Sequence, residues 1–281
     1  MDIDLLQVRA IVRRALAEDL GDGDVTSESI LPPSMVLRGR FISKESGFLA
    51  GLAVAAEVFG LLDEGIAFTP IQSDGDKISS GEVIADVTGP ARPILGGERV
   101  ALNFMQRMSG IATATRRYVE AVKGSGAVIL DTRKTAPSLR LLDKWAVSLG
   151  GGQNHRFGLY DMVLIKDNHI AAVGSIQEAV ARVRAQDARK RTIVVEVTDL
   201  EQLKQALALG VDRVMLDNMS LSEMEQAVRL TAGRVPLEAS GNITLENVAA
   251  VGDTGVDLIS VGSLTHSVSA LDISLEIIGE R

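Results

Sequence analysis

The sequence of 281 residues predicts an α/β protein whose first half is α+β and whose second half repeats a strand–helix unit. Two observations predict this class. The second half holds six short, continuous apolar runs, and such runs suit strands that are buried on both faces of a parallel sheet. Helical patterns with clear start signals lie between these runs, whereas the first half mixes helices, strands and turns without that rhythm.

The first half begins with a predicted helix, because apolar residues recur at helical spacing over residues 5–18. An acidic, glycine-rich turn at residues 18–24 ends this helix. Residues 36–43 and 82–87 are predicted strands, and residues 48–62 are a predicted buried helix between them. This half carries little obvious chemistry.

Residues 97–123 predict one long helix that is broken or loosened near Ser109 and Gly110. The predicted strands of the second half follow at residues 127–130, 162–165, 192–195, 213–216, 236–237 and 258–261. Three helices between them are predicted to begin at capping-box pairs, namely Ser175 with Glu178, Thr198 with Glu201, and Ser220 with Glu223. The apolar residues within 271–277 are expected to return to the first domain.

Six strand–helix units leave two architectures open. They are fewer than the eight units of a complete barrel, so the strands either close into a small or incomplete barrel or lie open as a doubly wound sheet. No GxGxxG sequence follows the first of these strands, which argues against a dinucleotide-binding fold.

Composition and charge exclude several classes of function. The chain has no cysteine, so it has no disulfide, no thiolate zinc site and no cysteine nucleophile, and a cytoplasmic location is expected. A net charge of −8 argues against a general attraction to nucleic acid. The N-terminus lacks a signal-peptide pattern and no apolar stretch is long enough to span a bilayer, so no membrane partner is expected.

Each predicted strand of the second half ends in polar residues, and the ligands of strand–helix folds bind beyond those ends. Four cations gather there: Arg133, Lys134, Arg156 and Lys166. In an acidic protein they favour a ligand with several negative charges, because guanidinium and ammonium groups form strong charged hydrogen bonds to carboxylates and phosphates. The alternative is local pairing with carboxylates that are near in the sequence, namely Asp131, Asp161 and Asp167.

Glycine and hydroxyl residues end the last two units, as Ser240-Gly241-Asn242 and Gly262-Ser263. Loops at these places are the usual phosphate site of barrel enzymes, so we favour a phosphate over plain turn chemistry. Glu196 and Asp217 end the third and fourth strands. They fit a Mg²⁺ ion bound with a phosphate-bearing ligand or the stabilisation of a positive carbon, and the alternative is a capping or ion-pairing role.

The three histidines lie in polar clusters. His155 lies shortly after the three glycines 150–152 and directly between Asn154 and Arg156, so we interpret it as a ligand contact. His169 fits a supporting role and a packing role equally well, and the role of His266 stays open. A Schiff base on Lys166 is chemically possible, but its charged and amide neighbours make a wet setting that disfavours it.

Several long motifs in a fixed order resemble the quinolinate phosphoribosyltransferase family, and the resemblance covers nearly the whole chain. The motifs are residues 18–26, 97–99 with Asn103, 109–113, 131–135, 150–156, 158–161, 166–170, 196–197, 216–218, 238–243 and 260–262. One departure is Ala136-Pro137-Ser138, where the family more often has a second threonine and a glycine.

The resemblance implies an N-terminal α+β sandwich domain, residues 1–108 joined by 268–281, and a C-terminal six-stranded, incomplete TIM-like α/β barrel, residues 109–267. It also implies a homodimer or a higher assembly of dimers, in which Arg99 is donated across the interface. The implied quinolinate-binding residues are Arg99, Thr132, Arg133, His155, Arg156 and Lys166. The implied residues for phosphoribosyl pyrophosphate are Lys134, Glu196, Asp217, Ser240, Gly241, Asn242, Gly262 and Ser263, of which the first three are catalytic and the two carboxylates hold Mg²⁺.

The implied activity joins quinolinate to phosphoribosyl pyrophosphate with loss of CO₂, giving nicotinate mononucleotide and pyrophosphate for de novo NAD biosynthesis. The alternatives are a related phosphoribosyltransferase of the same fold acting on another anionic base, a Schiff-base aldolase using Lys166, and a non-catalytic metabolite-binding protein. A base with one carboxylate needs fewer cations than the set implied for quinolinate, which argues against the first alternative. The intact pair Glu196 and Asp217 argues against the last.

Overall fold

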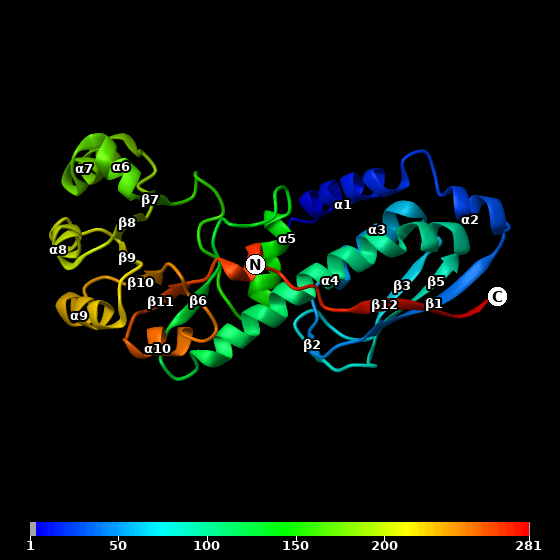
Figure 1. Cartoon of the computed structure of the whole chain (residues 1–281). Coiled ribbons are helices and arrows are strands. Elements are labelled where there is room, and N and C mark those ends of the chain that lie inside the picture. The colour runs from blue at the N-terminus through cyan, green and yellow to red at the C-terminus, as the bar shows by residue number, and fades with distance from the viewer. Residues whose placement is uncertain (1–3, 281) are drawn as a thin grey trace. The chain divides into compact units, whose positions relative to one another are not determined.

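The computed structural model describes residues 4–280 and divides into two compact units that interleave in the sequence (Figure 1). The first unit consists of the chain up to Arg116, of Thr135–Gly151 and of the segment from Ser267 onward. The second unit consists of Arg117–Lys134 and Gly152–His266. Among the described residues, no helix has both the length and the apolar character needed to cross a lipid bilayer.

The first unit contains a four-stranded antiparallel sheet with the strand order β12-β1-β5-β3. Its strands are β1 (Val36–Ser43), β3 (Ala67–Pro70), β5 (Val83–Pro90) and β12 (Ile273–Glu280), and a small second sheet pairs β2 (Gly47–Phe48) with β4 (Lys77–Ile78). Its helices are α1 (Leu5–Leu20), α2 (Val25–Ile30), α3 (Leu52–Leu62), α5 (Arg140–Leu149) and most of α4 (Ala91–Ala121). The C-terminal strand β12 thus lies beside β1.

Three phenylalanines form the centre of the first unit. Aromatic residues make up only 3% of the chain, but Phe41 of β1, Phe59 of α3 and Phe68 of β3 meet with ring centroids 5.7–6.0 Å apart. Phe41 and Phe59 are fully buried. Aromatic contacts at this separation add to the free energy gained by burying the rings, so this cluster fastens α3 to the sheet.

Helix α4 runs without interruption over its whole length, so the break predicted near Ser109 and Gly110 is wrong. Small residues stand there because other parts of the chain approach closely. A Cβ atom on Gly110 would lie 2.1 Å from the carbonyl oxygen of Ser269. The Ser109 hydroxyl accepts a hydrogen bond from the Ala50 N–H at 2.9 Å and donates one to the Ala50 carbonyl at 3.1 Å. Close packing therefore explains both residues without a bend.

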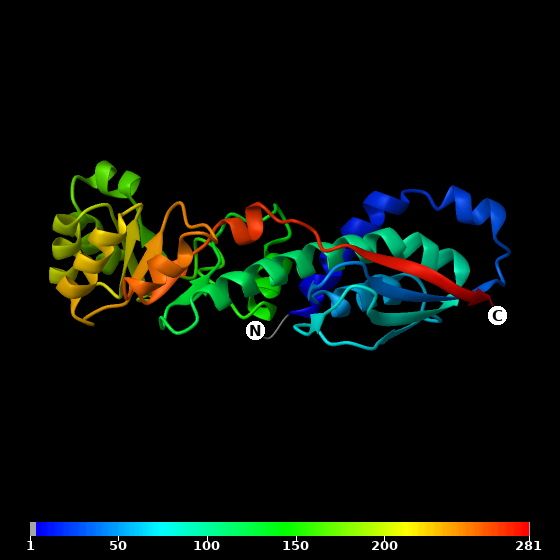
Figure 2. The same cartoon turned by 60° about the horizontal axis from the view of Figure 1, so that its bottom comes forward.

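The second unit contains a six-stranded parallel sheet with the strand order β6-β11-β10-β9-β8-β7. Its strands are β6 (Val128–Leu130), β7 (Val163–Ile165), β8 (Ile193–Val197), β9 (Arg213–Asp217), β10 (Leu237–Ser240) and β11 (Leu258–Ser260). Its helices are α6 (Asp167–Val173), α7 (Ile176–Gln186), α8 (Leu200–Ala208), α9 (Leu221–Thr231), α10 (Val248–Asp253) and α11 (Ser263–His266). Figures 1 and 2 show α7, α8 and α9 side by side along one side of the strands.

Strands β6 and β7 form the two edges of this sheet, although they are consecutive in the sequence. From β7 to β11 the neighbours follow the order of the chain, and β6 then pairs with β11. This strand order is that of a barrel that stays open between β6 and β7, because no hydrogen-bonded ladder joins these two strands. The structure therefore confirms the predicted α/β class, with an antiparallel sheet in the first unit and six parallel strands in the second.

Helix starts in the second unit follow the sequence signals with one exception. At α9 Ser220 and Glu223 form the predicted capping box, and at α7 Ser175 caps the helix by accepting the Glu178 N–H. At α8 the cap is Asp199, not Thr198, and its carboxylate accepts hydrogen bonds from two backbone N–H groups of the first turn. A carboxylate is the better cap at this position because it accepts both N–H groups and because its negative charge is favourable at a helix N-terminus.

Three strands extend further than their apolar runs. Strands β8, β9 and β10 include Glu196, Asp217 and Ser240, so these polar residues belong to the ladder and not to the loops after it. In the register of the sheet, Ser240 is the partner of Asp217, and Glu196 is the partner of Met215. The extended backbone of the neighbouring strands thus fixes the Cα positions from which these side chains project.

Candidate active site

A cavity of about 860 Å³ lies at the carboxyl ends of the parallel strands in the second unit. This volume falls within the range of small-molecule and cofactor sites. All six strands supply lining residues from their ends or from the loops that follow, and the segment before β7 supplies two more. The cavity is therefore placed where strand–helix folds bind their ligands.

Of the fourteen site residues predicted from the sequence, thirteen line this cavity: Thr132, Arg133, Lys134, His155, Arg156, Lys166, Glu196, Asp217, Ser240, Gly241, Asn242, Gly262 and Ser263. The other one, Arg99, is exposed on α4 in the first unit. His266, whose role the sequence left open, lines the cavity, whereas His169 does not.

Arg156 is a buried cation of the cavity wall, with 8% of its surface exposed. Its Nη1 donates a hydrogen bond to the carbonyl oxygen of Met162 at 3.2 Å. Burial lowers the pKa of Arg156, the charge of Arg133 lowers it further, and Asp161 opposes the shift. The guanidinium nevertheless stays charged near neutral pH, since the ordinary pKa of arginine lies far above neutrality. Two cations that repel each other at a cavity wall favour an anion beside them.

Asp131, which directly follows β6 and is fully buried, anchors the segment that carries His155 and Arg156. Its Oδ1 accepts a hydrogen bond from the His155 N–H at 2.9 Å, and its Oδ2 accepts one from the side-chain amide of Asn154 at 2.6 Å. Nδ1 of His155 accepts a hydrogen bond from the Arg156 N–H at 2.6 Å. Nε2 of His155 lies 3.3 Å from Oε1 of Glu238. The imidazole is thus fixed by a hydrogen bond at Nδ1, and its Nε2 faces the carboxylate of Glu238.

Lys166 and Glu196 form an ion pair in the cavity lining, between Nζ and Oε2. Lys166 follows β7 and Glu196 belongs to β8, so neighbouring strands direct the two side chains toward each other. The backbone of Lys166 is held as well, because Nδ1 of His169 accepts a hydrogen bond from the Lys166 N–H at 2.9 Å. His169 therefore supports the start of α6 rather than lining the cavity.

A chain of amide hydrogen bonds orients the carboxylate of Asp217. Nδ2 of Asn218 donates to Oδ2 of Asp217, and Nδ2 of Asn242 donates to Oδ1 of Asn218, both at 2.9 Å. Only glycine fits at position 241, because a Cβ atom there would lie 2.2 Å from Oδ1 of Asn218 and the φ angle of Gly241 is +95°. The glycine of this loop thus makes room for the asparagine that holds Asp217.

The loops after β6 and β11 meet around Lys134. The hydroxyl of Thr132 accepts a hydrogen bond from the Lys134 N–H, and the hydroxyl of Thr265 donates one to the Lys134 carbonyl, both at 3.0 Å. A Cβ atom on Gly262 would lie 3.0 Å from Cδ of Lys134. Gly262 therefore leaves space for the stem of the lysine, which reaches along the cavity lining.

Sequence reasoning missed the apolar part of the lining. Leu164 of β7 and Met215 of β9 line the cavity and pack in one buried cluster with Val194. Ile243 and Thr244 after β10 also line it. A continuous run of apolar residues does not show which side faces a ligand, so no signal in the sequence distinguishes Leu164 and Met215 from the rest of the core.

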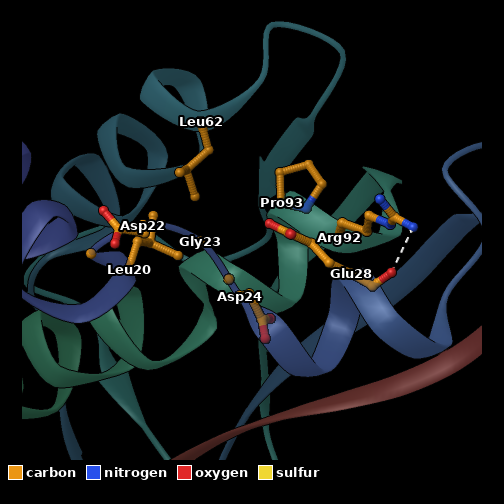
Figure 3. Close-up of a pocket in the computed structure, with 10 residues that line it drawn as sticks. Leu20, Asp22, Gly23, Asp24, Glu28, Leu62, Arg92 and Pro93 are labelled. Atoms are coloured by element: carbon orange, nitrogen blue, oxygen red, sulfur yellow. Dashed lines mark hydrogen bonds between the residues drawn. The ribbon is translucent and has the colours of Figure 1, made fainter.

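Another, smaller cavity of about 360 Å³ lies in the first unit beside the acidic glycine turn (Figure 3). Asp22, Asp24, Glu28 and Arg92 are among its lining residues. Arg92 donates hydrogen bonds from Nη2 to the carbonyl oxygens of Glu28 at 2.9 Å and Leu31 at 2.7 Å. The carboxylate of Asp24 accepts the first backbone N–H groups of α2. Its acidic lining disfavours an anion, so the cavity of the second unit is the candidate active site.

The carboxylates of the larger cavity fit a metal that comes with a phosphorylated substrate. In residues 4–280 no group of three or more His, Cys, Asp or Glu side chains is arranged to hold a metal ion. Glu196 and Asp217 are the carboxylate residues of the lining. Mg²⁺ commonly takes one or two protein carboxylates and completes its shell with substrate phosphates and water. The donor set therefore suits Mg²⁺ bound together with a pyrophosphate group.

Family models and curated relatives match the chain along nearly its whole length. The model described as quinolinate phosphoribosyl transferase, N-terminal domain, matches residues 24–109, and the model of the C-terminal domain matches residues 111–276. The chain is 47% identical over 272 residues to the probable nicotinate-nucleotide pyrophosphorylase (carboxylating) of Bacillus subtilis strain 168, which covers 97% of this chain and 94% of that protein. It is 46% identical over 289 residues to the chloroplastic nicotinate-nucleotide pyrophosphorylase (carboxylating) of Arabidopsis thaliana, over 96% of this chain and 82% of that protein.

Solved structures share the fold of both units. NadC from Streptococcus pyogenes matches with a TM-score of 0.95 and 43% identity, over 99% of this chain and 100% of that chain. The nicotinate-nucleotide pyrophosphorylase from Francisella tularensis matches with a TM-score of 0.94 and 41% identity, over 98% of each chain. Since both domain models match in order and relatives align from end to end, the chain belongs to the quinolinate phosphoribosyltransferase family.

Proposed function

We propose that this chain transfers the phosphoribosyl group of phosphoribosyl pyrophosphate to quinolinate, with release of pyrophosphate and CO₂, and so forms nicotinate mononucleotide for de novo NAD biosynthesis. One observation carries the proposal: a single cavity gathers four cations and two carboxylates from the ends of β6 to β9 and from the segment before β7. Both substrates carry several negative charges, and a basic cavity in an acidic protein suits both.

Quinolinate is assigned to the wall that contains Arg156. Its two carboxylates lie on neighbouring ring atoms, and guanidinium groups bind carboxylates through two parallel hydrogen bonds. Burial and the charge of Arg133 lower the pKa of Arg156, and a bound carboxylate counters both effects. The residues proposed for this wall are Thr132, Arg133, His155, Arg156 and Lys166.

Phosphoribosyl pyrophosphate is assigned to the other side of the cavity. Lys134, Glu196 and Asp217 are proposed as the catalytic residues, with Mg²⁺ held by the two carboxylates and the pyrophosphate. The metal, when bound, supplies positive charge that neutralises the leaving group. The residues proposed for the 5′-phosphate are Ser240, Gly241, Asn242, Gly262 and Ser263, where glycines allow backbone N–H groups to approach an anion.

The first step needs positioning and charge more than a general base. The quinolinate ring nitrogen already has a lone pair, and it bonds to C1 of the ribose while the bond from C1 to the pyrophosphate oxygen breaks. Positive charge develops on the ribose ring in the transition state, as in glycoside cleavage. Glu196 and Asp217 stabilise that charge, and Lys134 stabilises the departing pyrophosphate.

Loss of CO₂ follows from the pyridinium formed in the first step. The bond between the ring and the carboxylate next to the nitrogen breaks, and its electron pair stays on the ring carbon, which then takes up a proton. The positive ring nitrogen stabilises this electron pair. In this step the protein holds the ring while the departing carboxylate loses its hydrogen bonds to the cationic wall.

We further propose that the active form is a cytoplasmic homodimer, or an assembly of dimers, in which Arg99 completes the site of a second copy. Arg99 is exposed on α4 and is not among the lining residues of the cavity. The family resemblance assigns this guanidinium to the dicarboxylate. In a two-fold dimer each subunit can supply such a residue to the other.

One assay tests the proposed activity. The purified protein is combined with phosphoribosyl pyrophosphate, Mg²⁺ and quinolinate that is radiolabelled in the carboxylate next to the nitrogen. We expect nicotinate mononucleotide and labelled CO₂ in equal amounts, and neither product from Lys166→Ala. Mononucleotide formed from nicotinate but not from quinolinate would favour the related transferase instead.

The aldolase alternative has its own test. Lys166 pairs with Glu196, and an ammonium group in an ion pair is not a nucleophile. We therefore expect that borohydride reduction in the presence of carbonyl substrates leaves the mass of the protein unchanged. A covalent adduct that disappears in Lys166→Ala would favour the aldolase.

A further inference from the structure

Glu238 is a carboxylate inside the second unit with no surface exposed to solvent. It belongs to β10, the fourth strand from the β7 edge, and its partners come from three other parts of the chain. Ser260 of β11 donates a hydrogen bond to Oε1, and Nη1 of Arg213 in β9 lies 3.1 Å from Oε2. Nε2 of His155, from the segment before β7, lies 3.3 Å from Oε1.

A buried carboxylate of this kind is costly unless it is paired and hydrogen-bonded. Burial alone would raise the pKa of Glu238, but the contacts with His155, Ser260 and Arg213 outweigh it and lower the pKa overall. The group is therefore charged in the folded protein. Nothing in the proposed reaction uses Glu238 directly, because it is not among the residues that line the cavity.

The hydrogen bond at Nδ1 identifies the tautomer of His155. The backbone N–H of Arg156 points at Nδ1 at 2.6 Å, and an N–H donor needs a lone pair on the atom that it faces. The ring proton is therefore on Nε2, the atom that faces the Glu238 carboxylate. The carboxylate favours this tautomer, because the partner of one ring nitrogen decides which nitrogen carries the proton.

We propose that Glu238 is a positioning residue, which holds the His155 imidazole in the Nε2–H tautomer and thereby fixes the Arg156 backbone at the cavity wall. Nδ1 of His155 then orients the Arg156 backbone while Nε2 faces Glu238, so His155 also acts on the anionic substrate through the place that it gives to Arg156. The identity of that substrate as quinolinate rests on the proposed function. The tautomer and its dependence on Glu238 do not.

Nuclear magnetic resonance of protein labelled with nitrogen-15 in histidine tests the tautomer without any substrate. The chain has three histidines, and the signals that vanish in His155→Asn belong to His155. We expect a protonated Nε2 and an unprotonated Nδ1 for His155 in the wild-type protein. In Glu238→Gln, which keeps the size of the side chain but removes its charge, we expect this single tautomer to be lost.

Steady-state kinetics tests the consequence for the substrate. In Glu238→Gln we expect the KM for quinolinate to rise about tenfold, as a displaced binding group produces, while kcat and the KM for phosphoribosyl pyrophosphate stay within about twofold. Arg213→Met is the matched control, because it removes the partner of Oε2 and leaves the Oε1 contact with His155 in place. We expect it to lower the unfolding temperature without changing the tautomer or the KM.

If Glu238→Gln does not fold, two variants of His155 carry the test. The side-chain oxygen of Asn reaches the position of Nδ1 and accepts the Arg156 N–H, whereas Gln reaches the position of Nε2. We expect His155→Asn to keep a quinolinate KM closer to that of the wild type than His155→Gln does. Equal losses in the two variants would overturn the proposal.

Three other results would overturn it as well. They are an Nδ1–H tautomer in the wild-type protein, an unchanged tautomer in Glu238→Gln, and an equal rise of the quinolinate KM in Arg213→Met. The absence of any reaction with quinolinate would instead contradict the proposed function. The tautomer measurement needs no substrate and would still test the role of Glu238, so a failure of the proposed function is distinguishable from a failure of this proposal.

Discussion

The two cavities of the molecule both contain charged side chains, but these side chains bond to different parts of the protein. In the cavity of the first unit they bond to the main chain: Arg92 donates to two carbonyl groups, and Asp24 caps a helix. In the cavity of the second unit the two carboxylates bond to side chains, since Glu196 pairs with Lys166 and Asn218 donates to Asp217, whereas Arg156 donates to the carbonyl oxygen of Met162.

This difference separates charges that stabilise the fold from charges that serve a ligand. Removing a group that completes main-chain hydrogen bonding leaves backbone groups unpaired and lowers the free energy of unfolding. A carboxylate or a guanidinium held by a single hydrogen-bond partner still has further hydrogen-bonding capacity to offer to a ligand. We therefore expect substitutions in the cavity of the first unit (the first cavity) to lower stability and substitutions in the cavity of the second unit (the second cavity) to lower activity.

Asp217→Asn is expected to produce the largest effect. The amide keeps the shape of the side chain and an oxygen for the hydrogen bond from Asn218, but it removes the negative charge that the proposed transition state and Mg²⁺ require. We expect kcat to fall about 100- to 1000-fold, the loss typical of removing one preorganised electrostatic group. Kinetics together with the unfolding temperature measures this. A lower unfolding temperature with an unchanged kcat would place Asp217 among the structural charges.

Arg133→Ala should weaken the binding of quinolinate by about 2–5 kcal/mol, because a substrate carboxylate loses its cationic partner. Calorimetric titration measures the Kd. The matched control is Arg92→Ala in the first cavity, which we expect to lower the unfolding temperature and to leave that Kd unchanged. A quinolinate Kd for Arg133→Ala within about twofold of the wild-type value would show that Arg133 is not a carboxylate contact.

Mixed dimers test whether the second cavity is completed by another copy. Arg99→Ala and Lys166→Ala are each expected to be inactive, and hybrid dimers of the two should contain one intact site. Random exchange makes half of the dimers hybrids, so about a quarter of the wild-type activity should return. Native mass spectrometry confirms the exchange. No recovery in a sample that contains hybrids would mean that Arg99 is not donated to a partner.

The same contrast explains how much the sequence could predict. Polar residues at the ends of apolar runs are visible in one sequence, and the parallel sheet brings thirteen of the predicted residues to one cavity. Glu238 shows the limit. The sequence displays a charge at the end of a short apolar run, but its partners Arg213, Ser260 and His155 come from two other strands and a distant loop. No local pattern encodes contacts of that range.

Local rules also misled where packing decides. Ser109 and Gly110 are poor helix formers, and propensity alone predicts a break in α4. The close approach of Ser269 and Ala50 requires small residues at these positions, and the helix continues through them. Arg99 is a different case. Its place in the site follows from the family resemblance, and within one chain it does not line the cavity.

Asp24→Ala in the first cavity is expected to have the smallest effect. Asp24 caps α2, and losing such a cap lowers the free energy of unfolding by about 1 kcal/mol. Hydrogen bonds from the Ser27 hydroxyl and from the N–H groups of Ser27 and Thr26 hold the pKa of Asp24 below its ordinary value. A folded-state pKa below the unfolded one means that this stabilisation is complete above the unfolded pKa, about 3.9, and is lost as the pH falls through the folded pKa.

Urea denaturation of the wild-type protein and of Asp24→Ala measures this directly. The difference in the free energy of unfolding should be constant from about pH 7 to pH 5 and should shrink toward about pH 3, while kcat at neutral pH stays that of the wild type. A difference that grows as the pH falls would have the wrong sign for a carboxylate with a lowered pKa. A loss of kcat without a loss of stability would mean that the acidic cavity takes part in the reaction, and the distinction between the two cavities would then fail.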